Sequence, residues 1–262
     1  MKALILGAGY GTRLTQGLND LDPILKDKYT PAIANKPKPL ILVAGKTVLE
    51  YLLEKISGET DIKDVYVVTN AYFYPQFQQW QKGYQSPLNI TIFNDGTLSN
   101  ETRLGVLGDI NFALQEGKIQ DNLFILAGDT LFEMDFGALT RRFYQKQSSI
   151  ISVYEENWNV LHRRGIVVAD QSGKVIDFQE KPLKPKTNLA APIAYILTKE
   201  VVTNLPKLLG PDYGKEDNLV ARIIQNKTVE FHTFHFPARY DLGNIGDFIR
   251  ADKIFSEKRG QQ

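Results

Sequence analysis

Short apolar segments alternate with amphipathic stretches through the first two thirds of the chain. Four of these segments predict buried strands, at residues 3–6, 65–68, 90–93 and 123–126. Near-continuous apolar runs of this length are typical of a parallel sheet that is covered on both faces. Apolar residues with helical spacing predict helices between and after them, at residues 47–56, 111–114 and 139–144. The alternation of strands and helices indicates a doubly wound α/β sheet.

The pattern changes after Ser148, where apolar segments become shorter. Residues 150–154, 165–169 and 175–178 are predicted strands, and the turn-forming run 170–173 separates the last two. We therefore expect a smaller mixed or antiparallel section beside the main sheet. Two helices, a strand and a closing helix are predicted at residues 201–209, 219–224, 231–236 and 245–255, before a frayed tail at 257–262. Together these elements predict a single α/β domain with a Rossmann-like mixed sheet.

One stretch, residues 15–37, fits neither pattern. It is long and polar, and it carries aspartate, lysine and proline residues without a clear periodicity. Irregular segments of this length inside a compact domain are usually functional or disordered. We therefore expect either a lid over a ligand or a disordered segment here.

Composition narrows the class of protein. The 262 residues carry 31 lysines and arginines against 30 aspartates and glutamates, a net charge of +1. This balance argues against a nucleic-acid partner held by bulk charge. The absence of cysteine excludes disulfides, thiolate zinc sites and cysteine nucleophiles. The first apolar run is too short for a signal segment or a membrane span, so we expect a cytoplasmic protein without a membrane partner.

A glycine-rich loop follows the first predicted strand. Its residues are Leu6, Gly7, Ala8, Gly9, Tyr10, Gly11, Thr12 and Arg13. Glycines at alternate positions let the backbone turn sharply and present consecutive N–H groups, which form a nest for phosphate oxygens. Arg13 adds a positive charge that can make two parallel hydrogen bonds. A plain strand-to-helix turn needs only one glycine, so the loop favours an anion-binding site.

Two other phosphate-binding motifs fit this sequence poorly. A dinucleotide-binding loop has its third glycine three residues after the second, whereas Gly11 comes one place early and Thr12 stands at the expected position. A Walker A loop ends in Gly-Lys-Ser or Gly-Lys-Thr. Residues 45–47 match that ending, but Leu40 stands where the first glycine belongs. We interpret residues 45–47 as a tight turn and a helix start.

The loop and several later segments resemble the sugar-phosphate nucleotidyltransferases. The resemblance begins with residues 9–14 (GYGTRL) and 36–40 (KPKPL). It continues in the family's order with residues 126–131 (LAGDTL), 165–167 (GIV), 178–182 (FQEKP) and 241–248 (DLGNIGDF). The resemblance implies the nucleotide-diphospho-sugar transferase fold. Within this single domain, residues 1–147 would mainly bind the nucleotide, and residues 148–262 would mainly bind the sugar and form the C-terminal helix.

The implied reaction is nucleotidyl transfer. An oxygen of a sugar 1-phosphate attacks the α-phosphorus of a nucleoside triphosphate, and pyrophosphate leaves. A phosphate monoester is already an adequate nucleophile, so the protein needs only to bring two anions together and to neutralise charge. The resemblance assigns catalysis to Arg13, Lys38 and Lys181, and it assigns triphosphate binding to the loop at residues 6–13.

The resemblance also implies a metal and two specificity pockets. Asp129 and Asp241, each at a predicted strand end, would share one Mg²⁺. Base recognition is expected between residues 94 and 109, where Gly105 and Gly108 would admit the base against the backbone. The sugar side would consist of Gly165, Glu180, Lys181 and Asn188, with Lys181 on the sugar's phosphate and Glu180 on its hydroxyl groups.

The sequence also departs from the family pattern. The stretch at 15–37 makes the spacing between Arg13 and Lys38 about twice the compact family spacing. Val106 and Leu107 replace the expected threonine and alanine beside the base, which leaves the base open. Ala194 stands where a sugar-pocket glycine is expected, which leaves the sugar open.

Other functions are compatible with the same residues. A cytidylyltransferase that acts on a non-sugar phosphate such as phosphocholine uses the same chemistry. A catalytically silent relative would bind nucleotide as a regulatory subunit, although the intact charged residues argue against silence. A dehydrogenase is disfavoured by the glycine spacing. The expected partners are a nucleoside triphosphate and a sugar 1-phosphate, without nucleic acid, and a homo-oligomer stays open.

Overall fold

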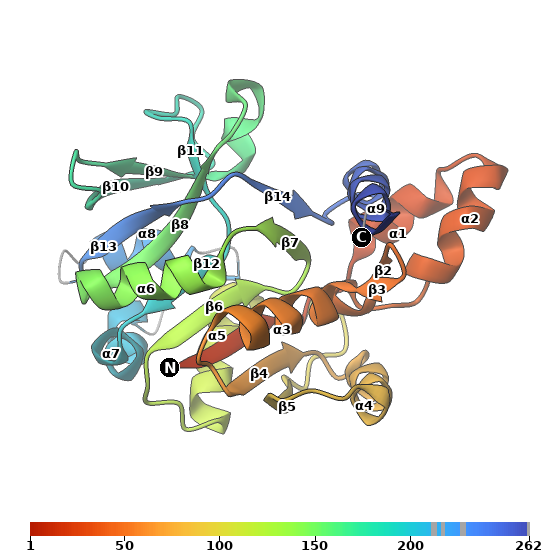
Figure 1. Ribbon diagram of the computed structural model, residues 1–262, viewed down its shortest axis with the longest axis horizontal. Helices are drawn as coiled ribbons and strands as arrows, with labels where there is room; N and C mark the ends of the chain where they lie inside the picture. Colours follow the sequence, from red (N-terminus) through yellow and green to blue (C-terminus); the bar gives the residue numbers. More distant parts are fainter. Residues whose placement is uncertain (211–213, 216–217, 226–228, 261–262) are drawn as a thin grey trace.

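A computed structural model describes residues 1–210, 214–215, 218–225 and 229–260 (Figure 1). Within this part of the chain, ten strands form one sheet. Its first half is parallel, with β1 (Lys2–Leu6) between β4 (Asp64–Thr69) and β6 (Leu123–Ala127), and β5 (Asn89–Asn94) at the edge beside β4. All four predicted strands of this half are present, but β5 is not buried as expected, because it lies at the edge and all its residues are at least partly exposed.

The second half of the sheet is mainly antiparallel and joins the first through β12 (Ala194–Leu197), which pairs with β6. Beyond β12 lie β8 (Ser149–Glu155), β11 (Leu189–Ala191), β9 (Gly165–Ala169) and β10 (Val175–Glu180), while β13 (Phe231–His235) runs parallel to β8. The predicted smaller antiparallel section is therefore present. It continues the main sheet because β12 pairs with β6 of the first half and with β8 of the second.

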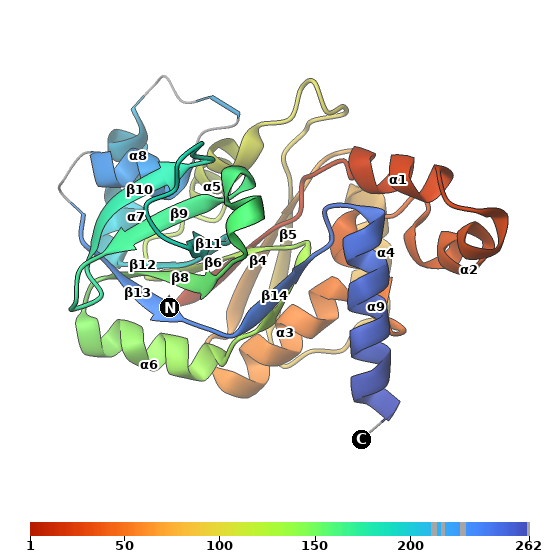
Figure 2. The same cartoon turned by 90° about the horizontal axis from the view of Figure 1, so that it is seen from above.

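Helices cover both faces of the sheet (Figure 2), as expected for a doubly wound fold. One face packs α3 (Val48–Glu59), α4 (Tyr74–Gly83) and α6 (Phe136–Lys146), and the other packs α5 (Gly105–Glu116), α7 (Lys199–Leu209) and α8 (Leu219–Gln225). Side chains of β1 alternate between the two cores, with Ala3 and Ile5 on one side and Leu4 on the other. This alternation buries residues 3–5 of β1 completely and fixes the carboxyl end of the strand in the middle of the molecule.

Residues 45–47 form a turn and a helix start, as predicted. A short hairpin joins β2 (Leu42–Val43) to β3 (Lys46–Thr47). Ala44 and Gly45 turn it, with φ values of +49° and +79°. Thr47 then caps α3 in a capping box with Glu50.

The expectation of a disordered segment at residues 15–37 is wrong, and its alternative, a lid over a ligand, stays a prediction. Most of this stretch forms two helices, α1 (Thr12–Asn19) and α2 (Pro23–Ile33). The signal lay in apolar residues four positions apart, since Leu14 and Leu18 are buried in α1 and Tyr29 and Ile33 are buried in α2. Asp22 caps α2 by accepting hydrogen bonds from two backbone N–H groups.

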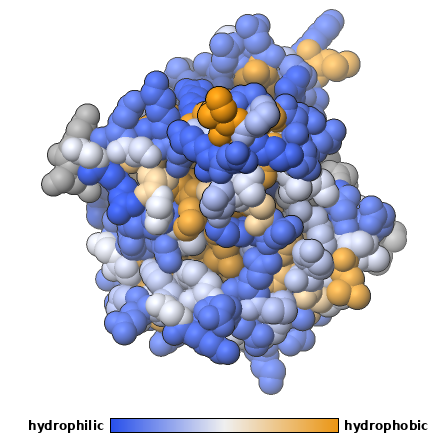
Figure 3. Space-filling model, turned by 90° about the vertical axis from the view of Figure 1, so that its right-hand side faces the viewer, coloured by the Kyte–Doolittle hydropathy of each residue, from blue (hydrophilic) through white to orange (hydrophobic). Residues whose placement is uncertain are grey.

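The helical pair α1–α2 packs beside the last helix, α9 (Ile245–Gly260) (Figure 1). A Cβ atom added to Gly17 would lie 2.8 Å from Ile245 Cγ2, so glycine lets the helices meet closely. Tyr29 and Phe248 make an edge-to-face contact at 5.5 Å between ring centroids. The outer surface on this side is mostly hydrophilic (Figure 3). The pair α1–α2 therefore packs against α9 and supports it.

The closing helix also corrects the predicted frayed tail. α9 runs to Gly260, so residues 257–260 are helical, whereas residues 261–262 lie outside the described chain. Lys258 contacts Glu133, and Arg259 donates to Ala44 O. These contacts hold the final turn, which the polar sequence alone did not reveal. None of the helices in the described ranges is long and apolar enough to cross a membrane.

Candidate functional site

The glycine loop lies at the carboxyl end of β1, between β4 and β6 (Figure 1). Gly7 N donates to Val68 O at 2.8 Å, and Asn70 Nδ2 donates to Ala8 O at 2.8 Å. Gly11 has φ = +65° and leads directly into α1, a conformation that glycine adopts without strain. Ligands of open α/β sheets gather at this edge. The loop predicted to bind an anion is therefore in a position where ligands commonly bind.

Pro39 packs against the loop and explains two of the glycines. A Cβ atom added to Gly7 would lie 2.9 Å from Pro39 Cγ, and one added to Gly128 would lie equally close to it. Real Cβ atoms essentially never come that near, so both positions require glycine. Pro39 belongs to the 3₁₀ turn η1 (Lys38–Leu40). Its packing between two glycines holds the neighbouring Lys38 in place.

Lys38 and Asp129 form an ion pair at the centre of the site. Lys38 Nζ lies 2.7 Å from Asp129 Oδ2, and the lysine side chain is only 14% exposed. Burial opposes the charge of Asp129, but the Lys38 ammonium more than offsets it and holds the pKa of Asp129 below its ordinary value. The structure thus brings together a predicted phosphate-binding cation and a predicted metal ligand.

Asp129 and Asp241 lie on adjacent backbone segments, although they are far apart in sequence. The strand β7 (Thr130–Glu133) pairs antiparallel with β14 (Ala238–Asp241), and Asp241 stands opposite Thr130. Leu242 N also donates to Asp129 O at 2.9 Å. The backbone pairing therefore places the two predicted metal ligands side by side.

Two arginines that were not predicted surround Asp241. Arg239 Nη1 lies 3.1 Å and Arg164 Nη1 lies 3.5 Å from Asp241 Oδ2. Arg239 Nε donates to Tyr154 Oη at 2.9 Å, and Tyr154 Oη donates to Glu156 Oε2 at 2.9 Å. Arg164 Nε lies 3.4 Å from the same Glu156 oxygen. These five side chains close a circle of contacts, which we call the Asp241 ring.

The sequence did carry a signal for both arginines. Arg239 precedes Asp241 by two residues in a strand, so the two side chains lie on one face. Arg164 directly precedes Gly165, a predicted sugar-side residue. Neither arginine belongs to the segments that carry the family resemblance, and both were overlooked for that reason.

Three predicted sugar-side residues lie beside this ring. Gly165 stands opposite Glu180 in the pairing of β9 with β10. A Cβ atom added to Gly165 would lie 2.5 Å from Phe178 Cζ, so glycine is needed for this approach. Lys181 N donates to Arg164 O at 2.9 Å, and Lys181 Nζ lies 3.6 Å from Glu180 Oε1. The Asp241 ring and the predicted sugar side are therefore contiguous.

Two other predicted residues contribute little to this network. Arg13, in the first turn of α1, is exposed and makes no ion pair or hydrogen bond within the described part of the chain apart from the helix backbone. Asn188 accepts a hydrogen bond from Glu156 N through its carbonyl at 3.0 Å. Its side chain has no hydrogen bond with the residues that are described. The roles of Arg13 and Asn188 stay predictions.

Close packing around Gly105 and Gly108 explains why both positions hold glycine. Gly105 begins α5 with φ = +79°, and a Cβ atom there would lie 2.4 Å from Lys215 O. A Cβ atom on Gly108 would lie 2.6 Å from Leu104 Cβ. Local packing therefore accounts for both glycines, and their contact with a base stays a prediction.

A buried carboxyl cluster beside the glycine loop was also not predicted as such, although it falls in the 94–109 segment. Tyr10 Oη lies 3.0 Å from Thr97 Oγ1, which donates to Asp95 Oδ1 at 2.8 Å. Asp109 is 8% exposed. Asp95 Oδ2 and Asp109 Oδ1 are buried without a hydrogen-bond partner among the described residues. Burial, and then the charge of Asp95, raises the pKa of Asp109 to about 8.

The donor set at the centre fits a hard divalent cation such as Mg²⁺. Asp129 and Asp241 provide carboxylate oxygens on adjacent segments. The described ranges contain no group of three or more histidine, cysteine or acidic side chains placed to hold a metal. Mg²⁺ needs few protein ligands when phosphate oxygens and water supply the rest. Two carboxylates therefore suit a metal that binds together with a nucleotide.

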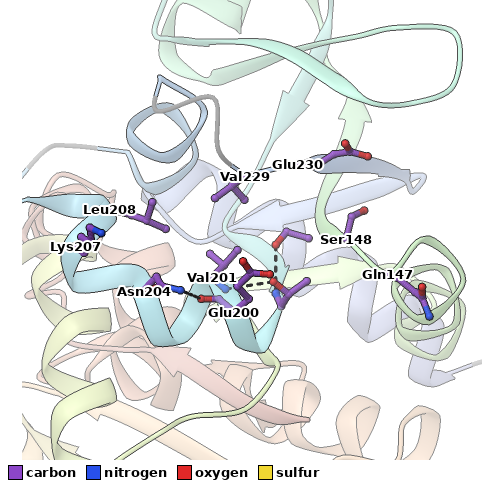
Figure 4. Close-up of a pocket in the computed structure, with 11 residues that line it drawn as sticks. Gln147, Ser148, Glu200, Val201, Asn204, Lys207, Leu208, Val229 and Glu230 are labelled. Atoms are coloured by element: carbon purple, nitrogen blue, oxygen red, sulfur yellow. Dashed lines mark hydrogen bonds between the residues drawn. The ribbon is translucent and has the colours of Figure 1, made fainter.

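A separate cavity of about 660 Å³ lies at the other end of the central strands, away from the glycine loop (Figure 4). Its lining includes Ser148, Glu200 and Asn204, from the start of the β8 segment and from α7. β12 ends there, opposite the first residue of β6, whereas Asp129 comes two residues after Ala127, the last residue of β6. The cavity lining shares no residue with the predicted site.

Comparison with known proteins gives a match over nearly the whole chain. A family model described as "Nucleotidyl transferase" matches residues 2–258. The bifunctional protein GlmU of Methanocaldococcus jannaschii is 24% identical over 263 residues, which are 98% of this chain and 55% of that protein. The UTP--glucose-1-phosphate uridylyltransferase of Synechocystis sp. is 25% identical over 267 residues, 96% of this chain and 62% of that protein. The chain thus spans less than two thirds of either relative.

Solved structures share the fold. A UDP-glucose pyrophosphorylase in complex with UDP-glucose superposes with a TM-score of 0.74 at 20% identity, covering 98% of both chains. A UDP-glucose pyrophosphorylase from Acinetobacter baumanii has the same TM-score at 17% identity, with 99% of this chain and 97% of that chain covered. These matches confirm the predicted fold, a mixed α/β sheet of the nucleotide-diphospho-sugar transferase type.

Proposed function

The chain belongs to the nucleotidyl transferase family, and from this premise we propose that it transfers a nucleoside monophosphate from a nucleoside triphosphate to a sugar 1-phosphate. An oxygen of the acceptor's phosphate bonds to the α-phosphorus, the bond from that phosphorus to the bridging oxygen breaks, and pyrophosphate leaves with the electron pair. One observation carries the proposal. Lys38, Asp129, Asp241 and Arg239 meet at the sheet edge that also holds the glycine loop.

The nucleotide side combines a backbone cradle with two cations of different kinds. The backbone of residues 7–12 cradles the triphosphate through its N–H groups, except that of Gly7, which donates to Val68 O. Lys38, fixed by Pro39 and largely buried, neutralises charge at the α-phosphate. Arg13 is exposed and reaches the leaving pyrophosphate. Positioned positive charges of this type stabilise the transition state of phosphoryl-group chemistry.

The metal side consists of Asp129 and Asp241, which would hold Mg²⁺. Bound there, Mg²⁺ supplies positive charge that neutralises phosphate oxygens. The chain's own contribution is to keep its carboxylates ionised. Lys38 does this for Asp129, because its ammonium lowers the pKa of that carboxyl.

The acceptor side comes from the second half of the chain. Glu180 accepts hydrogen bonds from sugar hydroxyls, Lys181 faces the acceptor's phosphate, and Gly165 and Asn188 line the sugar pocket. The acceptor attacks the nucleotide directly, and no residue carries a covalent nucleotide. Residues 1–147 thus mainly serve the nucleotide and residues 148–262 mainly serve the acceptor.

The base side is the carboxyl cluster together with the glycines of α5. Because its pKa is raised to about 8, Asp109 is mostly protonated at pH 7. A protonated carboxyl group both donates and accepts hydrogen bonds, as the edge of a nucleobase requires. Asp109, Thr97 and the backbone at Gly105 and Gly108 therefore select the base.

Pyrophosphate release from a substrate matrix tests this function. Each of five nucleoside triphosphates is combined with several sugar 1-phosphates and with phosphocholine, in the presence of Mg²⁺. We expect release that depends on one base and one sugar 1-phosphate, and none from the Asp129→Asn variant. Release with CTP and phosphocholine alone would replace the sugar by a non-sugar acceptor. Nucleotide binding without release from any pair would contradict the proposal and indicate a regulatory relative.

A further inference from the structure

The Asp241 ring has an unusual distribution of charge. Asp241 Oδ2 is within 3.5 Å of two guanidinium groups, those of Arg239 and Arg164. One arginine would suffice to neutralise this carboxylate. An oxygen that two guanidinium groups engage is poorly placed to bind a cation at the same time. The proposed metal ligand is therefore held by the protein's own positive charges.

The charged groups at the centre balance each other. Three carry positive charge and three carry negative charge, namely Lys38, Arg164 and Arg239 against Asp129, Glu156 and Asp241. A divalent cation bound alone leaves two positive charges in excess, and a phosphate monoester dianion bound alone leaves two negative charges in excess. Unbalanced charge is costly in a partly buried site. Only the two ligands together keep the centre neutral.

The two arginines of the Asp241 ring are placed to bind an oxyanion. Arg239 is 9% exposed in its side chain, and its guanidinium lies over the Tyr154 ring at 5.3 Å and donates to the Tyr154 hydroxyl. Its position is therefore fixed before any ligand arrives. Arg164 Nε is buried and forms an ion pair with Glu156 at 3.4 Å, but it makes no hydrogen bond with the described residues. A planar guanidinium binds phosphate through two parallel hydrogen bonds.

The ring also lies where the acceptor's phosphate is expected. Arg164 is the direct neighbour of Gly165, and its carbonyl accepts a hydrogen bond from Lys181 N. Both partners are assigned to the acceptor side under the proposed function. Asp241, on the other side of the ring, is assigned to the metal. The two arginines therefore lie between the acceptor and the metal.

Resting on that proposed function, we propose that Arg164 and Arg239 bind the phosphate of the acceptor and release Asp241 when they do so. The phosphate dianion takes over the guanidinium hydrogen bonds, and the freed carboxylate becomes available to the divalent cation. The acceptor phosphate and the cation then raise each other's affinity. The two arginines therefore make the site selective for an acceptor that carries a phosphate dianion.

The coupling is measurable without catalysis. Mn²⁺ replaces Mg²⁺, and the free Mn²⁺ concentration is followed by electron paramagnetic resonance during titration of the full chain, with and without methyl phosphate. Methyl phosphate is the smallest phosphate monoester and is mainly a dianion above its second pKa of about 6. For the unaltered protein, we expect methyl phosphate to tighten Mn²⁺ binding by about tenfold.

Arg239→Gln separates a ligand-binding role from a merely structural one. Without the guanidinium, Asp241 is freer, so Mn²⁺ alone binds more tightly than to the unaltered protein. Methyl phosphate loses its site, so the coupling falls to about twofold or less. Unchanged coupling in a folded Arg239→Gln variant, or weaker binding of Mn²⁺ alone, would overturn the proposal.

Two further variants complete the test. Arg141→Gln removes an arginine that also pairs with an aspartate, Asp135 at 3.7 Å, but lies on α6 outside the site, and its coupling should equal that of the unaltered protein. Arg164→Gln, at a more exposed position, should shift both quantities in the same direction as Arg239→Gln but by less. It decides the question if Arg239→Gln fails to fold, since unchanged coupling in this variant would also overturn the proposal.

The result is independent of the substrate matrix. Coupling that is lost in the arginine variants supports the phosphate site even if no tested acceptor yields pyrophosphate. Pyrophosphate release with intact coupling in both arginine variants supports the nucleotidyl transfer and rejects this role for the arginines.

Discussion

The two ends of the site hold their carboxyl groups in opposite ways. At the centre, Asp129 lies 2.7 Å from Lys38 Nζ, and Asp241 lies 3.1 Å from Arg239 Nη1. Beside the glycine loop, one carboxyl oxygen of Asp95 and one of Asp109 are buried without a hydrogen-bond partner among the described residues. The same side chain thus occurs paired with cations at one end and unpaired at the other.

This difference separates two kinds of recognition. Pairing with Lys38 holds the pKa of Asp129 below its ordinary value, and a charged carboxylate suits metal and phosphate chemistry. Burial without a cation keeps Asp109 protonated up to about pH 8, which suits hydrogen bonding to an uncharged base. The same end of the sheet therefore presents a charged centre and a cluster with a buried, protonated carboxyl group.

The largest effect is expected from removing a central carboxylate. Asp129→Asn and Asp241→Asn should each lower the turnover number at least about a thousandfold, because each would remove a charged oxygen from the two carboxylates that we propose to hold the metal. The midpoint of thermal unfolding should change little, since the amide keeps the size of the side chain. Pyrophosphate release and calorimetry measure both quantities. Full activity in either variant would refute the metal assignment.

The two cations of the nucleotide side should differ in which kinetic constant they control. Lys38→Met should lower kcat about a hundredfold, because Lys38 is fixed where charge develops. Arg13→Gln should raise KM for the nucleoside triphosphate about tenfold with a smaller change in kcat, because Arg13 is exposed and unpaired within the described chain. Steady-state kinetics with both substrates varied separates the two. Equal effects on kcat would show that pairing with Asp129 makes no difference.

The loss of unfolding free energy on replacing a glycine near the site should depend on how closely other atoms pack around that glycine. Gly128→Ala puts a Cβ atom 2.7 Å from Leu6 O, and this backbone contact should cost about 2 kcal/mol of unfolding free energy. Gly9→Ala is the matched control, because nothing lies within 4 Å of its added Cβ atom. It should change stability by less than about 0.5 kcal/mol. Denaturant unfolding checks both, and a Gly9→Ala loss as large as that of Gly128→Ala would disprove the packing argument.

The smallest effect is expected at Asp109, where pH is the readout. Its pKa rises on folding from an ordinary 3.8 to about 8. Between these values the folded chain binds a proton that the unfolded chain has released, so the contribution of Asp109 to stability falls as pH rises from about 4 to 8 and is level above that. Asp109→Asn should remove this decline and gain on the order of 1 kcal/mol at pH 8, since the new amide also lacks a full set of partners.

Thermal unfolding of both proteins from pH 4 to pH 9 measures this decline. Asp64→Asn serves as a control of opposite sign, because the hydrogen bond from Lys2 lowers the pKa of Asp64. Its contribution to stability is present above about pH 4 and lost below. An Asp109→Asn curve parallel to that of the unaltered protein would mean that Asp109 is ionised in the fold.

Local patterns predicted most of the architecture. The parallel strands of residues 1–127 and the helices α3 and α5 follow from apolar periodicity, and Thr47 marked the start of α3 correctly. The helix α4, between β4 and β5, was not predicted, since Phe77 is its one buried residue. The helical pair at residues 12–33 was missed because only Leu14, Leu18, Tyr29 and Ile33 carry its buried face. Four apolar residues in a polar stretch give a weak signal, and the contact that stabilises them, with α9, comes from the other end of the chain.

The site shows the same division between local and long-range information. Lys38, Asp129, Asp241 and Glu180 were found through segments that resemble a family. Their pairing was not found, because the contacts between Lys38 and Asp129 and between Arg164 and Asp241 join segments far apart in sequence. The contact of Asp241 with Arg239 is local, and it was overlooked because Arg239 lies just outside the segment that resembles the family. The burial of Asp109 was equally hidden, since a polar residue in a helix gives no sign of which face will pack. Whether an acidic side chain is charged in the folded protein depends on its ion pairs and its burial, and residue type alone shows neither.

Single-turnover release of pyrophosphate tests the central claim, direct attack by the acceptor's phosphate, most directly. Enzyme in excess over the nucleoside triphosphate is mixed with Mg²⁺, with and without the acceptor identified in the substrate matrix. Because no residue is assigned a covalent nucleotide, we predict stoichiometric release with the acceptor and none without it. A burst of pyrophosphate equal to the enzyme-bound nucleotide in the absence of acceptor would contradict the account and require a nucleotidylated residue.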